Sequence, residues 1–211
     1  MKVVFFGDSI SVGFGVSPHR TWVVRTARAL ADQVEGPILI ANSSVSGDTT
    51  RLGLERMPQA VQALEPDVLV VQFGLNDCNR WQTDGGVPRV SAEAFAANLR
   101  EILSRGRAFG ARRLLLHTNH PTLLLTDPAG LGGEPYEEGN RRYNDIIRGV
   151  GAGFEDIVVV DIEARFREVA TRAEVLQPLL LPDGIHLSER GHDLYFDIVM
   201  PCVRDAVEHL R

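Results

Sequence analysis

The sequence predicts an α/β protein in which about five parallel strands form a doubly wound sheet between two layers of helices. Short apolar runs alternate along the chain with longer segments whose apolar residues recur at helical spacing, which is the pattern of βα units around a parallel sheet. Polar motifs follow the apolar runs, where open α/β sheets bind their ligands. Because crossovers between parallel strands are right-handed and such strands are buried on both faces, a three-layer arrangement is the economical one.

The predicted strands are short runs dominated by Val, Ile, Leu and Phe. Runs of this length and composition are typical of buried strands. In chain order they are Val3–Phe6, Ile38–Ala41, Val68–Gln72, Arg113–His117 and Ile157–Asp161.

The predicted helices are the longer segments between and after these strands. Each carries apolar residues spaced to form one face of a helix, and that face would cover the sheet. In chain order they are Thr21–Gln33, Thr50–Leu64, Ala92–Phe109, Tyr136–Val150 and the closing helix Ser188–Leu210. No internal repeat or low-complexity linker interrupts this order, so we expect one domain spanning residues 1–211.

Composition limits the classes of partner. The chain has 211 residues, of which 44% are hydrophobic and 24% are charged, as is ordinary for one globular domain. Its 22 Lys and Arg against 28 Asp and Glu give a formal net charge of −6, without a basic block. We therefore expect no nucleic acid partner. No stretch approaches the roughly 20 apolar residues that span a bilayer, so we expect no transmembrane segment.

Cysteine usage and the opening segment bear on the compartment. Only Cys78 and Cys202 occur, which favours a reduced, cytoplasmic setting over a disulfide framework. The opening apolar run ends at Gly7-Asp8 and is too short for the hydrophobic region of a secretory signal. A mature secreted form stripped of its leader would look the same, and the oligomeric state is not predicted.

Two remote segments together supply a serine, a histidine and an aspartate. Gly7-Asp8-Ser9 follows the first strand, and Asp183-Gly184-Ile185-His186 precedes the last helix. A serine hydroxyl is a weak nucleophile at neutral pH, so a base must take its proton, and an imidazole held by a carboxylate is suited to do so. These residue types are the minimum equipment for acyl transfer without a metal, and we expect no cofactor.

Four blocks of the chain resemble those of the GDSL or SGNH hydrolases, a family named for a Ser, a Gly, an Asn and a His. The resemblance covers nearly the whole chain and implies the SGNH-hydrolase fold, a flavodoxin-like doubly wound sheet. Any one block alone would be weak evidence, whereas four in the right order are strong. In this sequence they are Gly7-Asp8-Ser9-Ile10, Gly47 within Asn42–Thr50, Gly74-Leu75-Asn76-Asp77 and Asp183-Gly184-Ile185-His186.

The resemblance implies a role for each block. Ser9 would be the nucleophile, His186 the general base and then general acid, and Asp183 the group that orients the imidazole. The backbone N–H groups of Ser9 and Gly47 and the side-chain amide of Asn76 would form the oxyanion hole. Such a preorganised donor is typically worth about 2.7–4 kcal/mol in the barrier.

Two long loops are expected to decide the substrate. The first, Asn79–Arg89, contains Trp81, and the second, Asn119–Glu138, begins with Asn119-His120 and holds Leu123-Leu124-Leu125. Loops of this length usually serve a site, so Trp81 and His120 are candidate substrate-binding residues. The leucines would either form a wall for an acyl chain or seal the loop against the sheet edge. No large apolar lid is evident, which favours small or soluble carboxylic esters with short-chain acyl or acetyl groups.

Other functions remain open from the sequence. A thioesterase or lysophospholipase-type acyl hydrolase of the same family would carry the same blocks, and the fold could also serve as a binding module with an inactive site. The first loop lacks the histidine that a metal-dependent phosphoesterase would carry two residues after Asp8, and no Gly-x-Ser-x-Gly string indicates an α/β-hydrolase. The residues whose types would suit a two-cation phosphoesterase site are Asp8, Asp48, Asp77, Asn119, His120, Asp183 and His186.

Overall fold

Five parallel strands form a single sheet in the order β2-β1-β3-β4-β5. The computed structural model describes all residues, 1–211. β1 lies beside both β2 and β3, and every pairing in the sheet is parallel. The strands are β1 (Lys2–Gly7), β2 (Leu39–Asn42), β3 (Val68–Gln72), β4 (Arg113–His117) and β5 (Ile157–Val160).

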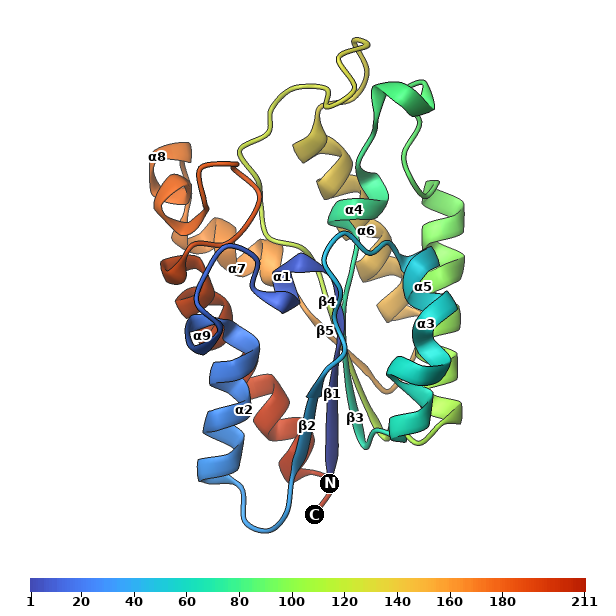
Figure 1. Cartoon of the computed structure of the whole chain (residues 1–211), viewed down its shortest axis with the longest axis vertical. Coiled ribbons are helices and arrows are strands. Elements are labelled where there is room, and N and C mark those ends of the chain that lie inside the picture. The colour runs from blue at the N-terminus through green and yellow to red at the C-terminus, as the bar shows by residue number, and fades with distance from the viewer.

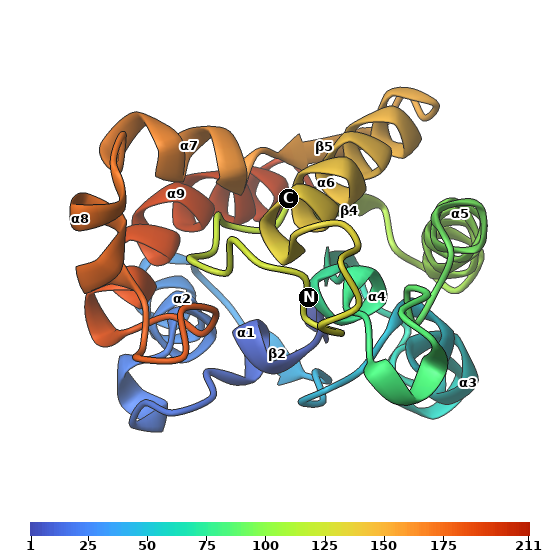
Figure 2. The ribbon, with the colours of Figure 1, turned by 90° about the horizontal axis from the view of Figure 1, so that it is seen from above.

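Helices cover both faces of the sheet and make three layers (Figures 1 and 2). α2 (Trp22–Gln33) and α9 (Glu189–Glu208) pack on one face, with α7 (Ile162–Val169) and the one-turn helix α8 (Ala173–Leu176) beside α9. The helices of the other face are α3 (Thr50–Ala60), α5 (Ala92–Ala108) and α6 (Tyr136–Ala152). The fold is therefore the three-layer α/β arrangement that the sequence predicts.

The strands at the centre of the sheet form the core because both of their faces are covered. Val68–Gln72 is buried at every position, and β1 is buried from Val3 onward. The edge strand β2 differs, since all of its residues are half-buried or exposed. Its prediction was displaced by one residue, because a strand with little buried surface has no apolar pattern to mark its ends.

Two helices differ from the prediction. The helix predicted to run to Leu64 ends at Ala60 and is followed by a 3₁₀ turn, Gln62–Leu64. Pro58 lies in its last turn, where it removes one backbone donor. α7 was not predicted, although Asp161 caps it through the N–H of Ala164. Its buried residues Ile162 and Phe166 are four apart, and this spacing could have revealed it.

Short helices and turns sit above the carboxyl ends of the strands (Figure 1). α1 (Ser9–Val12) follows β1 directly, and α4 (Leu75–Cys78) follows β3. The chain leaves β1 toward β2 on one side and reaches β3 on the other side of β1, so this is the point where strand order reverses and ligands of such sheets bind. Further 3₁₀ turns are Pro18–Arg20, Gln82–Asp84 and Gln177–Leu179. The helices include none with the length and apolar composition to cross a bilayer.

Candidate active site

A chain of hydrogen bonds joins the two segments that carry the serine, histidine and aspartate. Nε2 of His186 lies 2.9 Å from Oγ of Ser9, and Nδ1 of His186 lies 2.7 Å from Oδ2 of Asp183. A carboxylate only accepts, so Nδ1 carries the proton and Nε2 is free to accept from the serine hydroxyl. This arrangement brings together residues 177 positions apart in the sequence.

A tight turn holds the aspartate in place. Oδ1 of Asp183 accepts hydrogen bonds from the backbone N–H groups of Ile185 and His186, both at 2.9 Å. Partial burial opposes ionisation of Asp183, but the hydrogen bonds from the His186 ring and from these N–H groups outweigh it and lower the pKa of the carboxyl. Asp183 is therefore ionised at neutral pH and can stabilise a protonated imidazole.

Ser9 opens α1, and the residue before it caps that helix. Oδ1 of Asp8 accepts from the N–H of Ile10 at 3.0 Å, which satisfies one of the donors that a helix start leaves free. Asp8 is fully buried. Burial raises the pKa of Asp8 to about 7, the Ile10 N–H opposes this rise, and the nearby carboxylates of Asp77 and Asp48 add to it.

The buried carboxyl of Asp8 predicts a pH-dependent stability. Its pKa of about 7 lies above its ordinary value of 3.8, so the folded state retains this proton at pH values where the unfolded state has lost it. Between pH 3.8 and about 7, the two pKa values of this group, the free energy of unfolding should fall as pH rises, by up to about 1.4 kcal/mol per pH unit. Asp8→Asn should remove that contribution, so that urea titrations show the variant gaining stability relative to wild type from pH 4 to pH 8.

An exposed aspartate provides the control for this measurement. Asp32 lies on the solvent side of α2, and Asp32→Asn should leave the pH profile of unfolding as it is in wild type. A constant difference in stability between Asp8→Asn and wild type across this range would contradict the assignment.

The other two predicted oxyanion donors, Gly47 and Asn76, lie on different segments of the chain. Asn76 belongs to α4, and its Nδ2 points at Oδ2 of Asp8 at 3.5 Å. Gly47 is exposed and has φ +83°, a left-handed conformation that glycine adopts readily. A Cβ at Gly47 would meet no atom within 4 Å. Glycine is therefore favoured here by the backbone conformation and not by lack of space.

Gly74 must also be glycine, because both its backbone conformation and the space around it exclude a side chain. Its φ is +136°, and a Cβ there would come within 2.5 Å of the side-chain amide nitrogen of Asn119. Asn119 Nδ2 donates to the carbonyl of Phe73, so a larger residue at position 74 would displace this contact and the α4 turn. The glycine of the third block therefore sets the position from which Asn76 projects.

The aspartate that follows Asn76 has a structural role. Oδ1 of Asp77 accepts from the N–H and the hydroxyl of Thr50, which ties α4 to the start of α3. Burial raises the pKa of Asp77 to about 6, although the Thr50 hydrogen bonds oppose the rise. No three His, Cys, Asp or Glu side chains lie close enough together to hold a metal ion, so the residues considered for a two-cation phosphoesterase are not gathered into such a site.

His120 does not face the substrate, contrary to the prediction. The residue is 0% exposed, and its Nε2 lies 2.7 Å from the carbonyl of Ile185. Burial lowers the pKa of His120 to about 4, so the ring is neutral at pH 7 and donates from Nε2 to that carbonyl. His120 thus supports the turn that carries His186. Trp81, in contrast, is 46% exposed at the rim of the site.

Two nearby side chains were not singled out from the sequence. The ring of Phe14 lies against the His186 imidazole, with centroids 4.5 Å apart, and Phe14 is half exposed. Arg89 donates to the carbonyl of Gly47 and to Oδ1 of Asn76. Neither belongs to a motif, and their distance in sequence from the residues they contact hides them.

Cys78 is buried, and burial raises the pKa of its thiol above the neutral range, so it is not a nucleophile at neutral pH.

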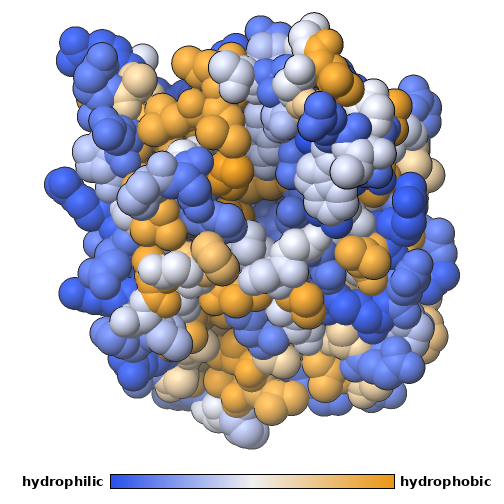
Figure 3. Space-filling view, turned by 45° about the horizontal axis from the view of Figure 1, so that its top comes forward, coloured by the Kyte–Doolittle hydropathy of each residue, from blue (hydrophilic) through white to orange (hydrophobic).

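Two cavities are lined by residues of this site. One, of about 610 Å³, is bordered by Asp183 and by apolar residues of two loops, Leu123, Leu124, Leu180 and Leu181. The other, of about 230 Å³, is lined by Thr49, Arg51, Leu52, Asp84 and Arg89. Figure 3, which tilts this rim toward the viewer, shows apolar surface on one side of a hollow and more hydrophilic surface on the other.

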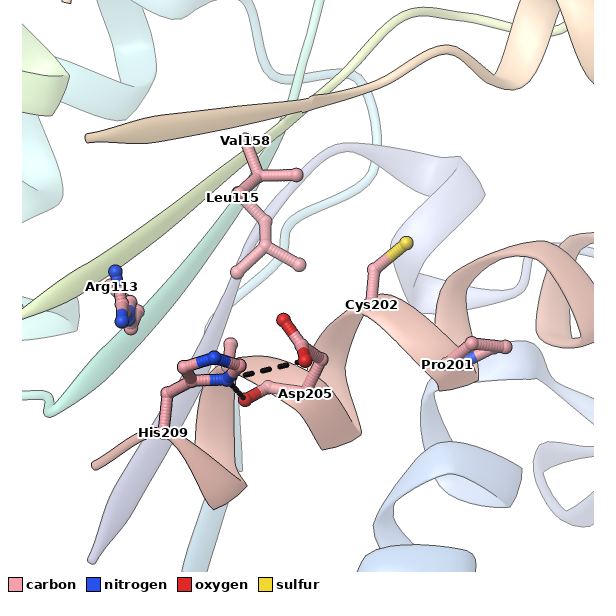
Figure 4. A pocket seen from close by; sticks show the side chains of 8 residues that line it. Arg113, Leu115, Val158, Pro201, Cys202, Asp205 and His209 are labelled. Atoms are coloured by element: carbon pink, nitrogen blue, oxygen red, sulfur yellow. Dashed lines mark hydrogen bonds and ion pairs between the residues drawn. The ribbon is translucent and has the colours of Figure 1, made fainter. Parts of the chain in front are cut away.

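A third cavity lies away from this rim. It has a volume of about 380 Å³ and lies between β4, β5 and the C-terminal part of α9 (Figure 4). Its residues include Arg113 at the start of β4, and His209, whose ring hydrogen-bonds the backbone carbonyl of Asp205. Burial raises the pKa of its only thiol, Cys202, so the cavity carries no activated nucleophile.

Comparisons with known proteins identify the family of this chain. Residues 5–194 match the GDSL-like lipase/acylhydrolase family. The chain is 30% identical over 210 residues to an arylesterase of Vibrio mimicus, covering 99% of this chain and 90% of that protein. It is 29% identical over 208 residues to thioesterase 1/protease 1/lysophospholipase L1 of Escherichia coli K12, covering 98% of this chain and 85% of that protein.

A solved structure supports the fold. The crystal structure of the acetyl xylan esterase AlAXEase matches with a TM-score of 0.76 at 20% identity, covering 96% of this chain and 100% of that one. The predicted SGNH-hydrolase fold is thereby confirmed, and the chain belongs to the GDSL-like lipase/acylhydrolase family as a serine hydrolase of ester bonds.

Proposed function

We propose that Ser9, His186 and Asp183 form the catalytic triad of a carboxylesterase that acts on short-chain acyl or acetyl esters. The observation that carries this proposal is the continuous hydrogen-bond chain from Ser9 Oγ through His186 to Asp183. Asn76 lies beside Asp8, the residue before Ser9, and Arg89 donates to both Asn76 and Gly47. These groups match the roles that acyl transfer requires: a nucleophile, a base, a group that orients the base, and donors for the oxyanion.

The reaction follows from this geometry in two steps. Ser9 Oγ attacks the ester carbonyl while its proton moves to Nε2 of His186, and the carbonyl electron pair moves to the oxygen. Collapse of this tetrahedral intermediate expels the alcohol, which takes the proton from His186 and leaves an acyl group on Ser9. A water molecule then repeats the sequence, with His186 as base and then acid, and releases the carboxylic acid.

The oxyanion is formed on the side of Ser9 that faces Gly47 and Asn76. The N–H groups of Ser9 and Gly47 and the Nδ2 of Asn76 would donate to it. No atom lies within 4 Å of the position that a Cβ of Gly47 would occupy, so a substrate can approach this backbone closely. Ionised Asp183 stabilises the imidazolium that exists at the same moment, since its Oδ2 lies 2.7 Å from Nδ1.

The surroundings of the triad support a short acyl group. The leucine-containing loop is fastened to the turn that carries Asp183 and His186, because Leu123 N–H donates to the carbonyl of Gly184. Leu123 and Leu124 line the cavity bordered by Asp183, whereas Leu125 is 69% exposed. Ser9 lines neither this cavity nor the one lined by Arg89, so a short acyl group carried on Ser9 need not enter either of them.

A panel of substrates tests this proposal. Aryl esters of one chromogenic alcohol with acyl chains of two to sixteen carbons should show kcat/KM highest at two to four carbons and about tenfold or more lower at twelve. The panel should include an acyl thioester and an acetylated sugar. A maximum at long chains, or a preference for the thioester, would instead favour a lysophospholipase or thioesterase.

Covalent labelling tests the serine mechanism separately. An alkyl phosphonate should modify wild type once and stop hydrolysis, with the label located by mass spectrometry on Ser9. Activity that resists the label but disappears with a chelator would overturn the serine mechanism in favour of metal chemistry.

A further inference from the structure

Arg89 lies thirteen residues after Asn76 but returns to its side. The loop between them closes on itself, because the N–H of Arg89 donates to the carbonyl of Asn79 at 2.9 Å and Arg80 pairs with Pro88 in an antiparallel bridge. The N–H of Val90 then donates to the carbonyl of Asp77. The base of the loop is therefore fixed to α4, and the Arg89 side chain starts from a defined position.

The guanidinium of Arg89 connects two of the oxyanion loops. Its Nη1 lies 3.2 Å from the carbonyl oxygen of Gly47 and 3.4 Å from Oδ1 of Asn76. Its other support is Trp81, since the guanidinium carbon lies 4.5 Å from the centre of that ring. A planar guanidinium can stack on an aromatic face and still donate in its own plane, so Trp81 and Gly47 together hold it in place.

The contact with Arg89 decides which way the amide of Asn76 faces. A guanidinium donates hydrogen bonds and accepts none, so only Oδ1 of Asn76 can face it. Nδ2 must then point the other way, where it meets Oδ2 of Asp8 at 3.5 Å, in the residue adjoining Ser9. Both contacts of this amide are long, so its orientation depends on the Arg89 contact being present beside the Asp8 contact. Without the cation the amide could turn over and present oxygen toward the developing oxyanion.

We propose that Arg89 is a positioning residue that fixes the amide of Asn76 with its nitrogen toward the oxyanion, using the Gly47 carbonyl and the Trp81 ring as its own supports. This inference rests on the proposed function, because it assigns Asn76 as an oxyanion donor. Arg89 acts through Asn76 and does not itself touch the reacting atoms. Its loss should therefore affect the transition state more than substrate binding.

Steady-state kinetics on a short-chain aryl ester test the proposal. Arg89→Met keeps the apolar stem beside Trp81 and removes every donor, and it should lower kcat by roughly 10- to 100-fold while KM changes by less than about threefold. Arg89→Lys restores a single cationic donor group, the ammonium, and should recover part of kcat. Arg100→Ala removes an exposed arginine of α5 and serves as the control.

A double-mutant cycle distinguishes positioning from general damage. In an Asn76→Ala background there is no amide to orient, so adding Arg89→Met should cost less than about threefold in kcat. If Arg89→Met does not fold, as judged by its thermal midpoint, Arg89→Ala replaces it in the same cycle. Wild-type kcat in the Arg89→Met variant, equal kcat in the Met and Lys variants, or an equal loss with and without Asn76 would overturn the inference.

The same experiment separates this inference from the proposed function. If wild type hydrolysed no ester, or if Ser9→Ala retained full activity, the proposed function would fail. A Ser9-dependent esterase whose rate does not depend on Arg89 would disprove only the role of Arg89.

Discussion

Ser9→Ala should lower kcat/KM for ester hydrolysis by roughly 10⁴- to 10⁶-fold, the largest loss expected from a single side chain. Ser9 supplies the only oxygen that the His186 Nε2 contacts, at 2.9 Å, so no other hydroxyl is placed to take over the attack. Residual turnover would come from water that reaches the carbonyl while the oxyanion donors remain. The measurement is steady-state hydrolysis of a short-chain aryl ester, together with phosphonate labelling of the same protein.

A second serine provides the matched control. Ser17 is exposed, and its side chain makes no capping hydrogen bond. Ser17→Ala should hydrolyse and be labelled as wild type is. Because Ser9 is small and its replacement leaves α1 and its Asp8 cap intact, thermal unfolding of Ser9→Ala should differ little from wild type. Turnover near the wild-type level in Ser9→Ala would rule out the acyl-enzyme mechanism.

His186→Ala should reduce kcat/KM by a similar factor, roughly 10⁴- to 10⁶-fold. Without the imidazole the Ser9 hydroxyl has no acceptor for its proton, and the Asp183 carboxylate is placed too far along the chain of hydrogen bonds to substitute. The alcohol would also lose the acid that protonates it on departure. Steady-state kinetics from pH 6 to 9 should show this loss throughout, because a missing base is not replaced by raising the pH within that range.

A double variant shows whether Ser9 and His186 act as one catalytic unit or contribute independently. Ser9→Ala combined with His186→Ala should be no slower than either single variant within about threefold, since each removes the same proton-coupled attack. His209→Ala, which replaces an exposed histidine in the cavity away from the triad, serves as the control and should leave kcat unchanged. Multiplied losses in the double variant would mean that the two residues act in separate steps.

The residues of the proposed triad could be predicted from the sequence because they lie in short blocks. Gly74-Leu75-Asn76-Asp77 follows an apolar run and Asp183-Gly184-Ile185-His186 precedes an amphipathic one, and both positions are visible in a linear pattern. The structure places Ser9, His186 and Asp183 in hydrogen-bond order. The two long loops were predicted as segments, but the orientations of their side chains were not.

His120 and Arg89 illustrate what the pattern could not show. His120 follows a strand on the ligand-binding edge, so it was expected in the site, yet its ring points inward and holds the carbonyl of Ile185. Arg89 ends a loop with no regular spacing, and only the closure of that loop onto Asn79 brings it back to Asn76. In both cases the deciding contacts join residues that are distant in sequence.

The sequence by itself determined the five strands and the five longest helices in chain order, the doubly wound class and the identity of the four blocks. These features follow from local properties: apolar runs buried on both faces, helical spacing, and polar residues at strand ends. Only the tertiary structure decided that Asp8 is buried beside Ser9, that His120 supports the triad turn, and that Arg89 orients toward Gly47 and Asn76. Burial and hydrogen-bond geometry depend on which segments meet in space, and local pattern does not specify that meeting.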